Sequence, residues 1–574
     1  MPIRQIVIAL IFALLLALAL IAPLRAPVVA APNAQSQITG PFTAPAQVAS
    51  FDGDVRRLPA PRAPVEPREV SHPRRIARAP AAPEIVAPRA HPAAPALENP
   101  RTVAPLQNFD GLDIYAGGGW VPPDPNGDVG PNHYLQAVNT ALGIFSKNGT
   151  ALAAFSYNTL FDHAFAPCDE TNYRRGDPIV LYDPLSDRWL ASDFAYANAT
   201  AGPFYQCIAV SKTSDPVNGG WWLYTINVGS TATPGVNWFN DYPKLAIWSD
   251  GIYLSADMFD ASNNFQTARV FAFNRDDLIG GAIPRNVGFD VGANYYHLLP
   301  SNLRGALPPS GTPNFFAAIT EPNLFHLWKF QVTNWSAFPP AATFTGPTNV
   351  LVNNFVMPCY AASTFHCVPQ LDTPQRVDGL GDRLMMQLQY RNFGGVESLW
   401  VNHTVADAAP IGYPTGVRWY EIRNPNGAPI VYQQGTFQPD SNYRWMASLA
   451  VDQLGNMALG YSVSSAAMYP AIRYTGRWAS DPLGKLCIGE TSLIEGTGSQ
   501  TGSRGYRWGD YSAMTIDPTD DLTFWYTNEY FVTTDAIWRT RIGSFKLGNL
   551  PTPPTGPYIY FFPLIFQGNA PMCY

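Results

Sequence analysis

The feature that most constrains the fold of this 574-residue chain is a short segment that recurs along its central part. In each copy a polar residue, usually Asp after Gly or Asn, comes directly before a short apolar run. The copies lie at 176–181, 240–245, 381–385 and 509–514, with looser ones at 132–135 and 442–446. Turns and further strand-like runs follow, so each copy begins a small antiparallel sheet.

The spacing of these copies predicts a β-propeller. They start roughly 45 to 70 residues apart, with one double gap that strand-like runs at 315–320 and 325–331 fill. No stretch of the body has a convincing 3.6-residue apolar period, so we expect an all-β fold. We predict a single β-propeller of about seven blades, with six or eight also compatible. A pair of β-sandwiches is the alternative, but it does not explain why the polar start recurs.

Four segments of the body are distinctive enough to suggest a family. They are Asp-Pro-Asn-Gly-Asp-Val-Gly-Pro-Asn-His-Tyr (124–134), Phe-Asn-Asp-Tyr-Pro-Lys-Leu (239–245), Tyr-Arg-Trp-Met-Ala-Ser (443–448) and Trp-Gly-Asp-Tyr-Ser-Ala-Met (508–514). With these segments the chain resembles a family of large exported bacterial proteins, regarded as propeller-like and of unassigned function. The resemblance covers nearly the whole body. It implies export and a propeller fold, and it implies no particular activity.

Residues 1–106 have the composition of a signal peptide followed by a spacer. A basic start, an apolar run at 6–24 and small residues at 29–31 predict a signal peptide over 1–31. A retained membrane anchor is the alternative, because the run is nearly long enough to span a bilayer. Residues 32–106 are rich in Pro and Ala with scattered Arg, which predicts a disordered spacer. Binding of a wall polymer by these arginines is the competing interpretation.

The body and the tail follow the spacer. We expect the propeller over 107–548 and a separate tail over 549–574, which opens with Pro and becomes apolar at 558–566. This apolar run is too short to span a membrane. It either serves sorting or docking of an exported protein, or forms an edge strand pinned to the body by Cys573.

The six cysteines predict disulfides. An even number in a chain bound for an oxidising compartment is typical of a disulfide framework, and no paired CxxC spacing indicates zinc. The pairing of Cys487 with Cys573 follows only by elimination. We predict three pairs, Cys168–Cys207, Cys359–Cys367 and Cys487–Cys573.

Charge limits the class of partner. The net charge is −7, and no basic face is visible in the body, so we do not expect nucleic-acid binding. After signal cleavage no stretch is long enough to remain in a membrane, and we expect a secreted or cell-surface monomer. The partner expected at one propeller face is a glycan or a protein.

The recurring polar starts supply the main candidate site. Innermost strands of a propeller begin near the central channel, so equivalent residues converge on one ring. We expect this ring to contain Asp177, Asp241, Asp382, Asp510 and His133, joined by Tyr443. Convergent carboxylates would raise one another's pKa or recruit a cation. The alternative is structural: each Asp accepts backbone N–H bonds at the start of its own blade.

A second candidate is a metal loop. Asp124, Asn126 and Asp128 alternate as in the first half of an EF-hand loop, which would fit Ca²⁺. The following Gly is displaced to Gly130, and no Glu closes the loop. An ordinary Asx-turn is therefore the default interpretation, and Ca²⁺ is the one cofactor that the sequence suggests.

A third hypothesis is a sialidase-like or other glycoside hydrolase that uses the channel mouth. Arg383, Arg444 and Arg507 lie at or beside three blade starts and could hold a carboxylate ligand. The remaining roles would be Tyr443 or Tyr511 as nucleophile and Glu529 or Asp510 as acid/base. The Ser-x-Asp-x-Gly-x-Thr-Trp box of sialidases is absent. Sequence alone leaves catalysis open and favours a binding module, since a propeller fold does not decide between the two.

Overall fold

The computed structural model describes residues 38–61, 68–69, 101–169, 174–198, 202–230, 236–359, 366–406, 414–502, 507–548 and 573–574. These residues form an almost entirely β structure. Its helices are short: α2 (Tyr157–Leu160), α3 (Arg275–Gly280) and the 3-10 turns η1 (Val55–Arg57) and η2 (Phe161–His163). None of the described helices is long and apolar enough to cross a bilayer. The predicted signal peptide lies outside the described residues.

The strands form antiparallel sheets that we number as blades in chain order. Blade 1 contains β6 (Asn126–Val129), β7 (His133–Val138), β8 (Ala141–Ser146) and β9 (Ala151–Ser156). Blade 2 contains β10 (Arg174–Asp183), β11 (Arg188–Tyr196), β12 (Phe204–Ser211) and β13 (Trp221–Ile226). Blade 3 contains β14 (Phe239–Ile247), β15 (Gly251–Phe259), β16 (Phe265–Asn274) and β17 (Asn286–Asp290).

Blades 4 and 5 share one continuous sheet, because β18 pairs in parallel with β24. Blade 4 contains β18 (Leu299–Leu303), β19 (Asn314–Thr320), β20 (Leu324–Asn334) and β21 (Ala341–Leu351). Blade 5 contains β24 (Met385–Phe393), β25 (Val396–Ala406), β26 (Thr415–Arg423) and β27 (Ile430–Phe437). Blade 6 contains β28 (Tyr443–Val451), β29 (Met457–Ser465), β30 (Met468–Arg477) and β31 (Ile488–Ile494).

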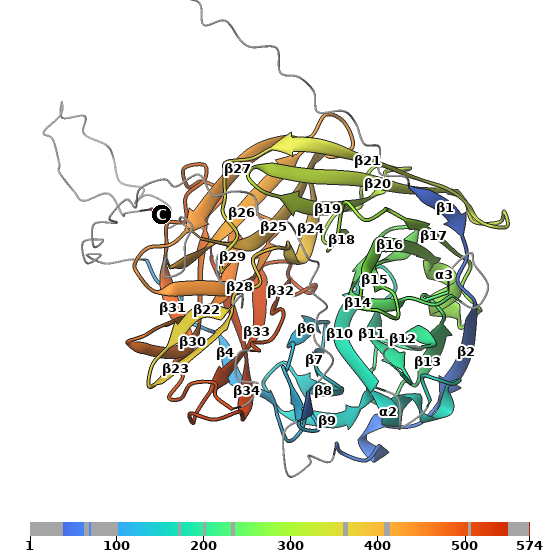
Figure 1. Ribbon diagram of the computed structural model, residues 1–574, viewed down its shortest axis with the longest axis horizontal. Coiled ribbons are helices and arrows are strands. Elements are labelled where there is room, and N and C mark those ends of the chain that lie inside the picture. Colours follow the sequence, from blue (N-terminus) through green and yellow to red (C-terminus); the bar gives the residue numbers. More distant parts are fainter. Residues whose placement is uncertain are drawn as a thin grey trace, which may run out of the picture. The chain divides into compact units, whose positions relative to one another are not determined.

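Blade 7 closes the ring with strands from both ends of the body. It contains β32 (Ala513–Ile516), β33 (Thr523–Phe531), β34 (Trp538–Lys546) and β4 (Gln107–Asp113). The N-terminal β4 pairs with the C-terminal β34, with Phe109 opposite Ile542. The innermost strands β6, β10, β14, β18, β24, β28 and β32 contact one another in a closed succession (Figure 1). The described residues therefore form a β-propeller around these innermost strands, as the recurring segment predicts.

Large aromatic side chains fill the wedges between blades. Trp248 of blade 3 lies between Phe315 and Tyr390, with ring centroids 6.1 and 4.8 Å away. Tyr134 of blade 1 stacks on Trp525 of blade 7 at 5.3 Å. Such contacts bury large apolar areas at low conformational cost, and they hold adjacent blades at a fixed angle.

Polar side chains of the innermost strands bind the backbone of the neighbouring blade. The N–H of Val180 donates to Asn126 Oδ1 at 2.7 Å, and the N–H of Ile247 donates to Asn302 Oδ1 at 3.0 Å. On the other side of the ring, the N–H of Val451 donates to Gln389 Oε1 at 2.6 Å. These bonds satisfy innermost backbone groups that have no strand partner on the channel side.

The predicted spacer must be corrected in part. Residues 38–61 form ordered structure on the propeller: β1 (Thr39–Phe42) pairs with β17, and β2 (Ala46–Phe51) pairs with β13 as a fifth strand of blade 2. The Pro-rich context concealed two short edge strands, a position in which Pro is tolerated. A further pair, β3 (Arg68–Glu69) and β5 (Trp120–Val121), is parallel. Residues 62–67 and 70–100 lie outside the described part.

The three predicted disulfides are confirmed: Cys168–Cys207, Cys359–Cys367 and Cys487–Cys573. The last of them fixes the C-terminal dipeptide to blade 6, where the N–H of Leu486 donates to Tyr574 O at 2.6 Å. The apolar run of the tail lies outside the described residues, so its role stays a prediction.

A hairpin follows blade 4 and precedes blade 5 in the sequence, but it packs against blade 6. It contains β22 (His366–Gln370) and β23 (Thr373–Asp378), and β22 contacts β29 and β30 of blade 6. The side chain of Gln370 donates from Nε2 to Gln500 O at 3.0 Å and accepts from the N–H of Gln500 at 2.8 Å. The hairpin therefore packs against blade 6 and against the segment that precedes blade 7.

Candidate functional site

The innermost strands begin at one face of the propeller, which we call the mouth face. Several starts there hold a non-glycine residue in the left-handed region: Asp124 (φ 46°), Asp177 (φ 52°), Tyr242 (φ 51°), His297 (φ 53°) and Met446 (φ 47°). In β10 and β14 the strand register shifts at the same point, so a bulge redirects the side chains. Backbone strain of this kind concentrates at sites where side-chain direction matters.

The mouth face gathers ionisable side chains from several blades. We name this group the mouth cluster. Its members are Asp124, Asp177, Asp241, Tyr242, Lys244, Asp257, His297, Asp382, Arg383, Arg507, Asp510, Tyr511 and Glu529. The structure thus brings together Asp177, Asp241, Asp382 and Asp510 with the candidates Arg383, Arg507, Tyr511 and Glu529. Their residues are nearly all buried.

The deepest part of the cluster joins blade 7 to blade 1. Arg507 Nη2 donates to Asp510 Oδ1 at 3.0 Å, while the N–H of Asp510 donates to Asp124 Oδ1 at 2.7 Å. Glu529 Oε1 accepts the N–H of Gly509 at 2.6 Å. Burial, with the nearby carboxylates, raises the pKa of Asp124 and of Glu529 well above the usual range. Asp510 Oδ2 and Glu529 Oε2 are buried without a hydrogen-bond partner in the described part of the chain.

A buried lysine occupies the centre. Lys244 Nζ lies 3.4 and 4.3 Å from the ring centroids of Tyr242 and Tyr511 and donates to Pro243 O at 3.0 Å. Burial lowers its pKa to about 8, although Asp177 opposes this. Burial and the charge of Asp241 raise the pKa of Asp177 to about 8. Sequence reasoning missed Lys244; a lysine inside an otherwise apolar strand was the available signal.

The outer part of the cluster centres on Asp382, whose side chain is 28% exposed. Arg383 Nε and Nη2 donate to Asp382 Oδ1 and Oδ2 at 2.8 and 3.2 Å. His297 bonds to Asp257 through Nδ1, and its Nε2 lies 3.6 Å from Asp382 Oδ2. Burial opposes ionisation of Asp382, but Arg383 and His297 hold its pKa well below the usual range. Burial and Arg383 disfavour protonation of His297, but Asp257 and Asp382 outweigh them and raise its pKa.

Among the recurring Asp residues, Asp177 bonds to backbone, but in the next blade: its Oδ2 accepts the N–H of Tyr242 at 3.0 Å. Asp257, which lies on the second strand of blade 3, makes a similar bond, because its Oδ1 accepts the N–H of His297 at 2.9 Å. These bonds connect neighbouring blades rather than closing one blade on itself. Asp510 instead bonds a side chain, Arg507, through Oδ1.

Three candidates lie away from the cluster. His133 begins β7 and is half-buried, and burial lowers its pKa. Burial raises the pKa of Tyr443, and the charge of Arg376 opposes this rise. Arg444 binds Asp440 Oδ1 at 2.7 Å and Glu490 Oε1 at 2.9 Å within blade 6. The three-arginine carboxylate site is therefore not formed, because Arg444 is engaged elsewhere and Arg383 and Arg507 each already bind an Asp.

The candidate metal loop has a different role. Asn126 and Asp128 lie in β6 and accept the N–H groups of Val180 and Tyr182 in blade 2 at 2.7 and 2.8 Å. Asp124 belongs to the mouth cluster, where Asn139 Nδ2 donates to its Oδ2 at 2.7 Å. Over the described ranges, no group of three or more His, Cys, Asp or Glu side chains is placed to hold a metal ion.

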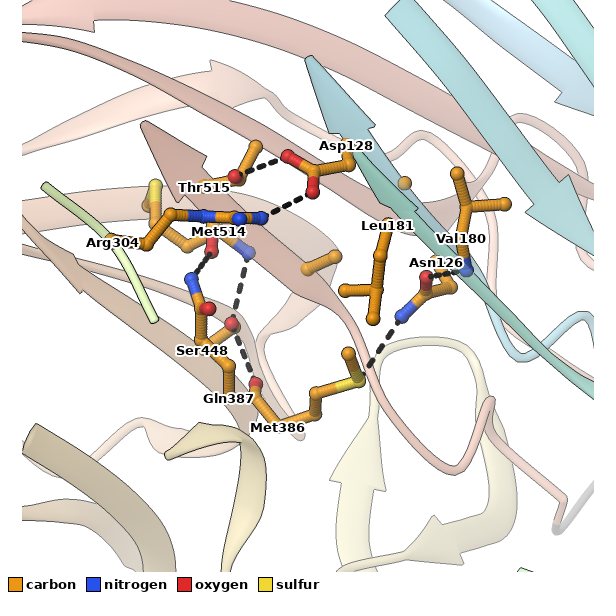
Figure 2. Close-up of a pocket in the computed structure, with 12 residues that line it drawn as sticks. Asn126, Asp128, Val180, Leu181, Arg304, Met386, Gln387, Ser448, Met514 and Thr515 are labelled. Carbon is orange, nitrogen blue, oxygen red and sulfur yellow. Dashed lines mark hydrogen bonds and ion pairs between the residues drawn. The ribbon is translucent and has the colours of Figure 1, made fainter. Parts of the chain in front are cut away.

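Below the mouth cluster the channel is blocked. Arg304 of blade 4 extends across it and binds the Asp128 carboxylate through Nη2 (Figure 2). Its Nη1 donates to Tyr182 O at 3.1 Å. The cavity left beside them, lined also by Gln387 and Ser448, measures about 10 Å³, which is room for one water. A ligand at the mouth therefore meets a closed floor.

Comparisons with known proteins give fold-level likeness only. No family model matches the chain, and no curated protein matches it. An exo-β-1,3-galactanase from Clostridium thermocellum aligns with a TM-score of 0.30 and 9% identity, covering 61% of this chain and 77% of that chain. Drosophila Plexin A in complex with Semaphorin 1b gives 0.29 and 9%, over 78% and 88%. An α-L-arabinofuranosidase from Lactobacillus brevis gives 0.26 and 14%, over 56% and 96%. These low scores assign no activity, and the propeller fold rests on the sheet order of this chain.

Proposed function

We propose that this protein is an exported β-propeller that binds a ligand, a glycan or a protein, at the mouth of its channel. The observation that carries the proposal is the mouth cluster, in which buried polar atoms of both signs lack hydrogen-bond partners among the described residues. Leaving such atoms unpaired costs stability. A ligand bound at the mouth would complete these hydrogen bonds.

Export is supported by two features. The sequence begins with a signal-like apolar run, and the body contains three disulfides. Disulfides persist in oxidising compartments and are rare in the cytosol. The ligand is then one that is met outside the cell or at its surface.

A mouth site is favoured over transport through the channel. The Arg304–Asp128 pair and the small residual cavity close the passage. A closed floor suits recognition of a terminal or protruding group of a larger ligand. Aromatic rings of Tyr242 and Tyr511 lie beside the ionisable groups, and such pairing of flat apolar and polar surfaces is common in ligand sites.

Hydrolysis of a glycan is the second candidate. The cluster contains unlike titratable groups whose pKa values are shifted, including Asp177 and Lys244 at about 8. Such shifts cluster at catalytic sites. The sialidase-like arrangement is not part of this candidate, because Tyr511 OH donates to Pro178 O at 3.1 Å and Arg444 lies apart.

The test is a combined binding and hydrolysis screen with the secreted, oxidised chain on a glycan array and a cell-envelope protein panel, with and without Ca²⁺. The matched variants are Asp382→Asn in the mouth cluster and Tyr443→Phe outside it. Binding that Asp382→Asn abolishes and Tyr443→Phe preserves supports the proposal. Turnover with the same sensitivity supports the hydrolase. Binding that neither variant changes places the ligand site elsewhere and overturns the proposal.

A further inference from the structure

Four residues around the exposed edge of the mouth cluster form a distinct group, which we call the mouth subsite. They are Tyr242, His297, Asp382 and Arg383. They come from β14, from the segment before β18 and from the segment before β24, so blades 3, 4 and 5 each contribute. The Arg383 guanidinium lies over the Tyr242 ring at 4.5 Å, and the Tyr242 ring meets the His297 ring edge-on at 5.3 Å.

Three polar atoms of this subsite have no hydrogen-bond partner in the described ranges. They are Arg383 Nη1, Tyr242 OH and His297 Nε2. Their residues are at most 5% exposed, so bulk water does not solvate them freely. Arg383 uses its other two nitrogens to hold Asp382, and His297 Nε2 lies 3.6 Å from the same carboxylate. The spare donors and the partly exposed acceptor are therefore neighbours.

This arrangement distinguishes between ligand groups. An anionic ligand group would lie beside the Asp382 carboxylate, and a cationic one beside Arg383, so a full charge of either sign meets a like charge. A hydroxyl both donates and accepts. One hydroxyl can donate to Asp382 while it accepts from Arg383 Nη1, and an adjacent hydroxyl can reach Tyr242 or His297.

We infer that the mouth subsite binds a pair of adjacent hydroxyl groups of an uncharged sugar. The inference rests on the proposed function and narrows its ligand to neutral glycans. Asp382 supplies the charged acceptor, Arg383 Nη1 and His297 Nε2 supply donors, and Tyr242 OH completes the set. His297 is fixed for this task by Asp257, which accepts its backbone N–H at 2.9 Å and bonds to its Nδ1.

The test is calorimetric titration of the full secreted chain with a set of methyl pyranosides. The set includes the glucoside, galactoside and mannoside, their monodeoxy analogues, glucuronate and glucosamine. We expect at least one neutral glycoside to bind, with roughly tenfold or greater loss when either adjacent hydroxyl is removed, because a subsite donor or acceptor is then left unpaired. Glucuronate and glucosamine are expected to bind more weakly than the neutral sugar.

The variants separate recognition from folding. Tyr242→Phe removes only an unpartnered hydroxyl and should weaken binding several-fold without changing the unfolding temperature. Tyr443→Phe makes the same chemical change outside the subsite and should leave affinity unchanged. Binding that is insensitive to Tyr242→Phe and Asp382→Asn, equal affinity for the deoxy analogues, or preference for a charged sugar overturns the inference while leaving a ligand-binding propeller intact. Failure of every pyranoside also overturns it, and the array and protein panel then decide the proposed function separately.

Discussion

Asp177 Oδ2 accepts the backbone N–H of Tyr242 at 3.0 Å and so connects the strand starts of blades 2 and 3 at the mouth of the channel. Both residues have a left-handed backbone, with φ of 52° and 51°. The bond therefore fixes two strained positions with respect to each other. It also orients the Tyr242 ring, which lies against Lys244 and Arg383.

Asp177→Asn should preserve stability near neutral pH, whereas Asp177→Ala should lose about 1–3 kcal/mol. Burial and Asp241 raise the Asp177 pKa from 3.8 to about 8. An Asn side chain resembles the protonated acid, can accept from Tyr242 and tolerates positive φ. Urea unfolding of the three proteins at pH 7 measures the difference, and equal losses for Asn and Ala would contradict the account.

The same group predicts a pH dependence of stability. Because the folded-state pKa exceeds the unfolded value, the folded chain retains the proton more strongly between pH 3.8 and about 8. This contribution is complete below the unfolded pKa and is lost as the pH rises through about 8. Asp177→Asn should flatten the decline of stability with pH over that window. An unchanged slope in the variant would show that Asp177 does not hold this proton.

The Arg304–Asp128 pair should be strongly coupled. Both residues are buried, so Arg304→Met or Asp128→Asn alone leaves an uncompensated charge at a cost of about 3–5 kcal/mol. The double variant should lose less than the sum of the two single losses, by at least about 1 kcal/mol. Denaturant unfolding of the four proteins supplies the cycle. If the double variant instead loses the full sum of the two single losses, Arg304 and Asp128 do not close the channel as an ion pair.

Removal of residues 1–58 should destabilise the propeller, whereas removal of 1–37 should not. The longer deletion strips β2 from the edge of β13 and removes the Asp52–Lys212 ion pair. We expect the unfolding temperature to fall by ~5 °C or more. Calorimetry on the two truncated chains makes the comparison. Equal unfolding temperatures would show that the added strands contribute nothing to the body.

Arg444→Ala should lower stability and leave ligand binding unchanged. Arg444 is buried and balances Asp440 and Glu490 in blade 6, so its loss leaves carboxylates with fewer partners. Paired measurement of unfolding and of ligand affinity distinguishes this role from a ligand-binding one. Loss of affinity in a folded Arg444→Ala protein would favour the three-arginine hypothesis.

The sequence allowed part of this site to be predicted because blade starts repeat. A polar residue before a buried strand marks the channel end of each blade, so the repeat alone predicts that Asp177, Asp382 and Asp510 lie on one face. The sequence did not indicate His297, because blade 4 lacks the recurring polar start. The sequence did not indicate Asp257 either, because this residue lies on the second strand of its blade. Its contact with His297 depends on how adjacent blades pack.

Other features depend on long-range pairing that a local pattern does not contain. β1 and β2 are short, lie among prolines and gain strand geometry from β17 and β13. Arg444 lies at a blade start, as Arg383 does, but its guanidinium binds Glu490 on β31 within blade 6. Position in the repeat therefore predicted the face of the propeller, while neighbouring strands determined the partner of each side chain.

Hydrogen-exchange mass spectrometry with the strongest binder from the glycan and protein screen tests the central claim most directly. A ligand at the channel mouth should slow amide exchange at the starts of β14 and β24, around Tyr242 and Arg383, and Asp382→Asn should abolish that protection. Protection confined to outer strands such as β21 and β27, with none at the starts of β14 and β24, would contradict a mouth site.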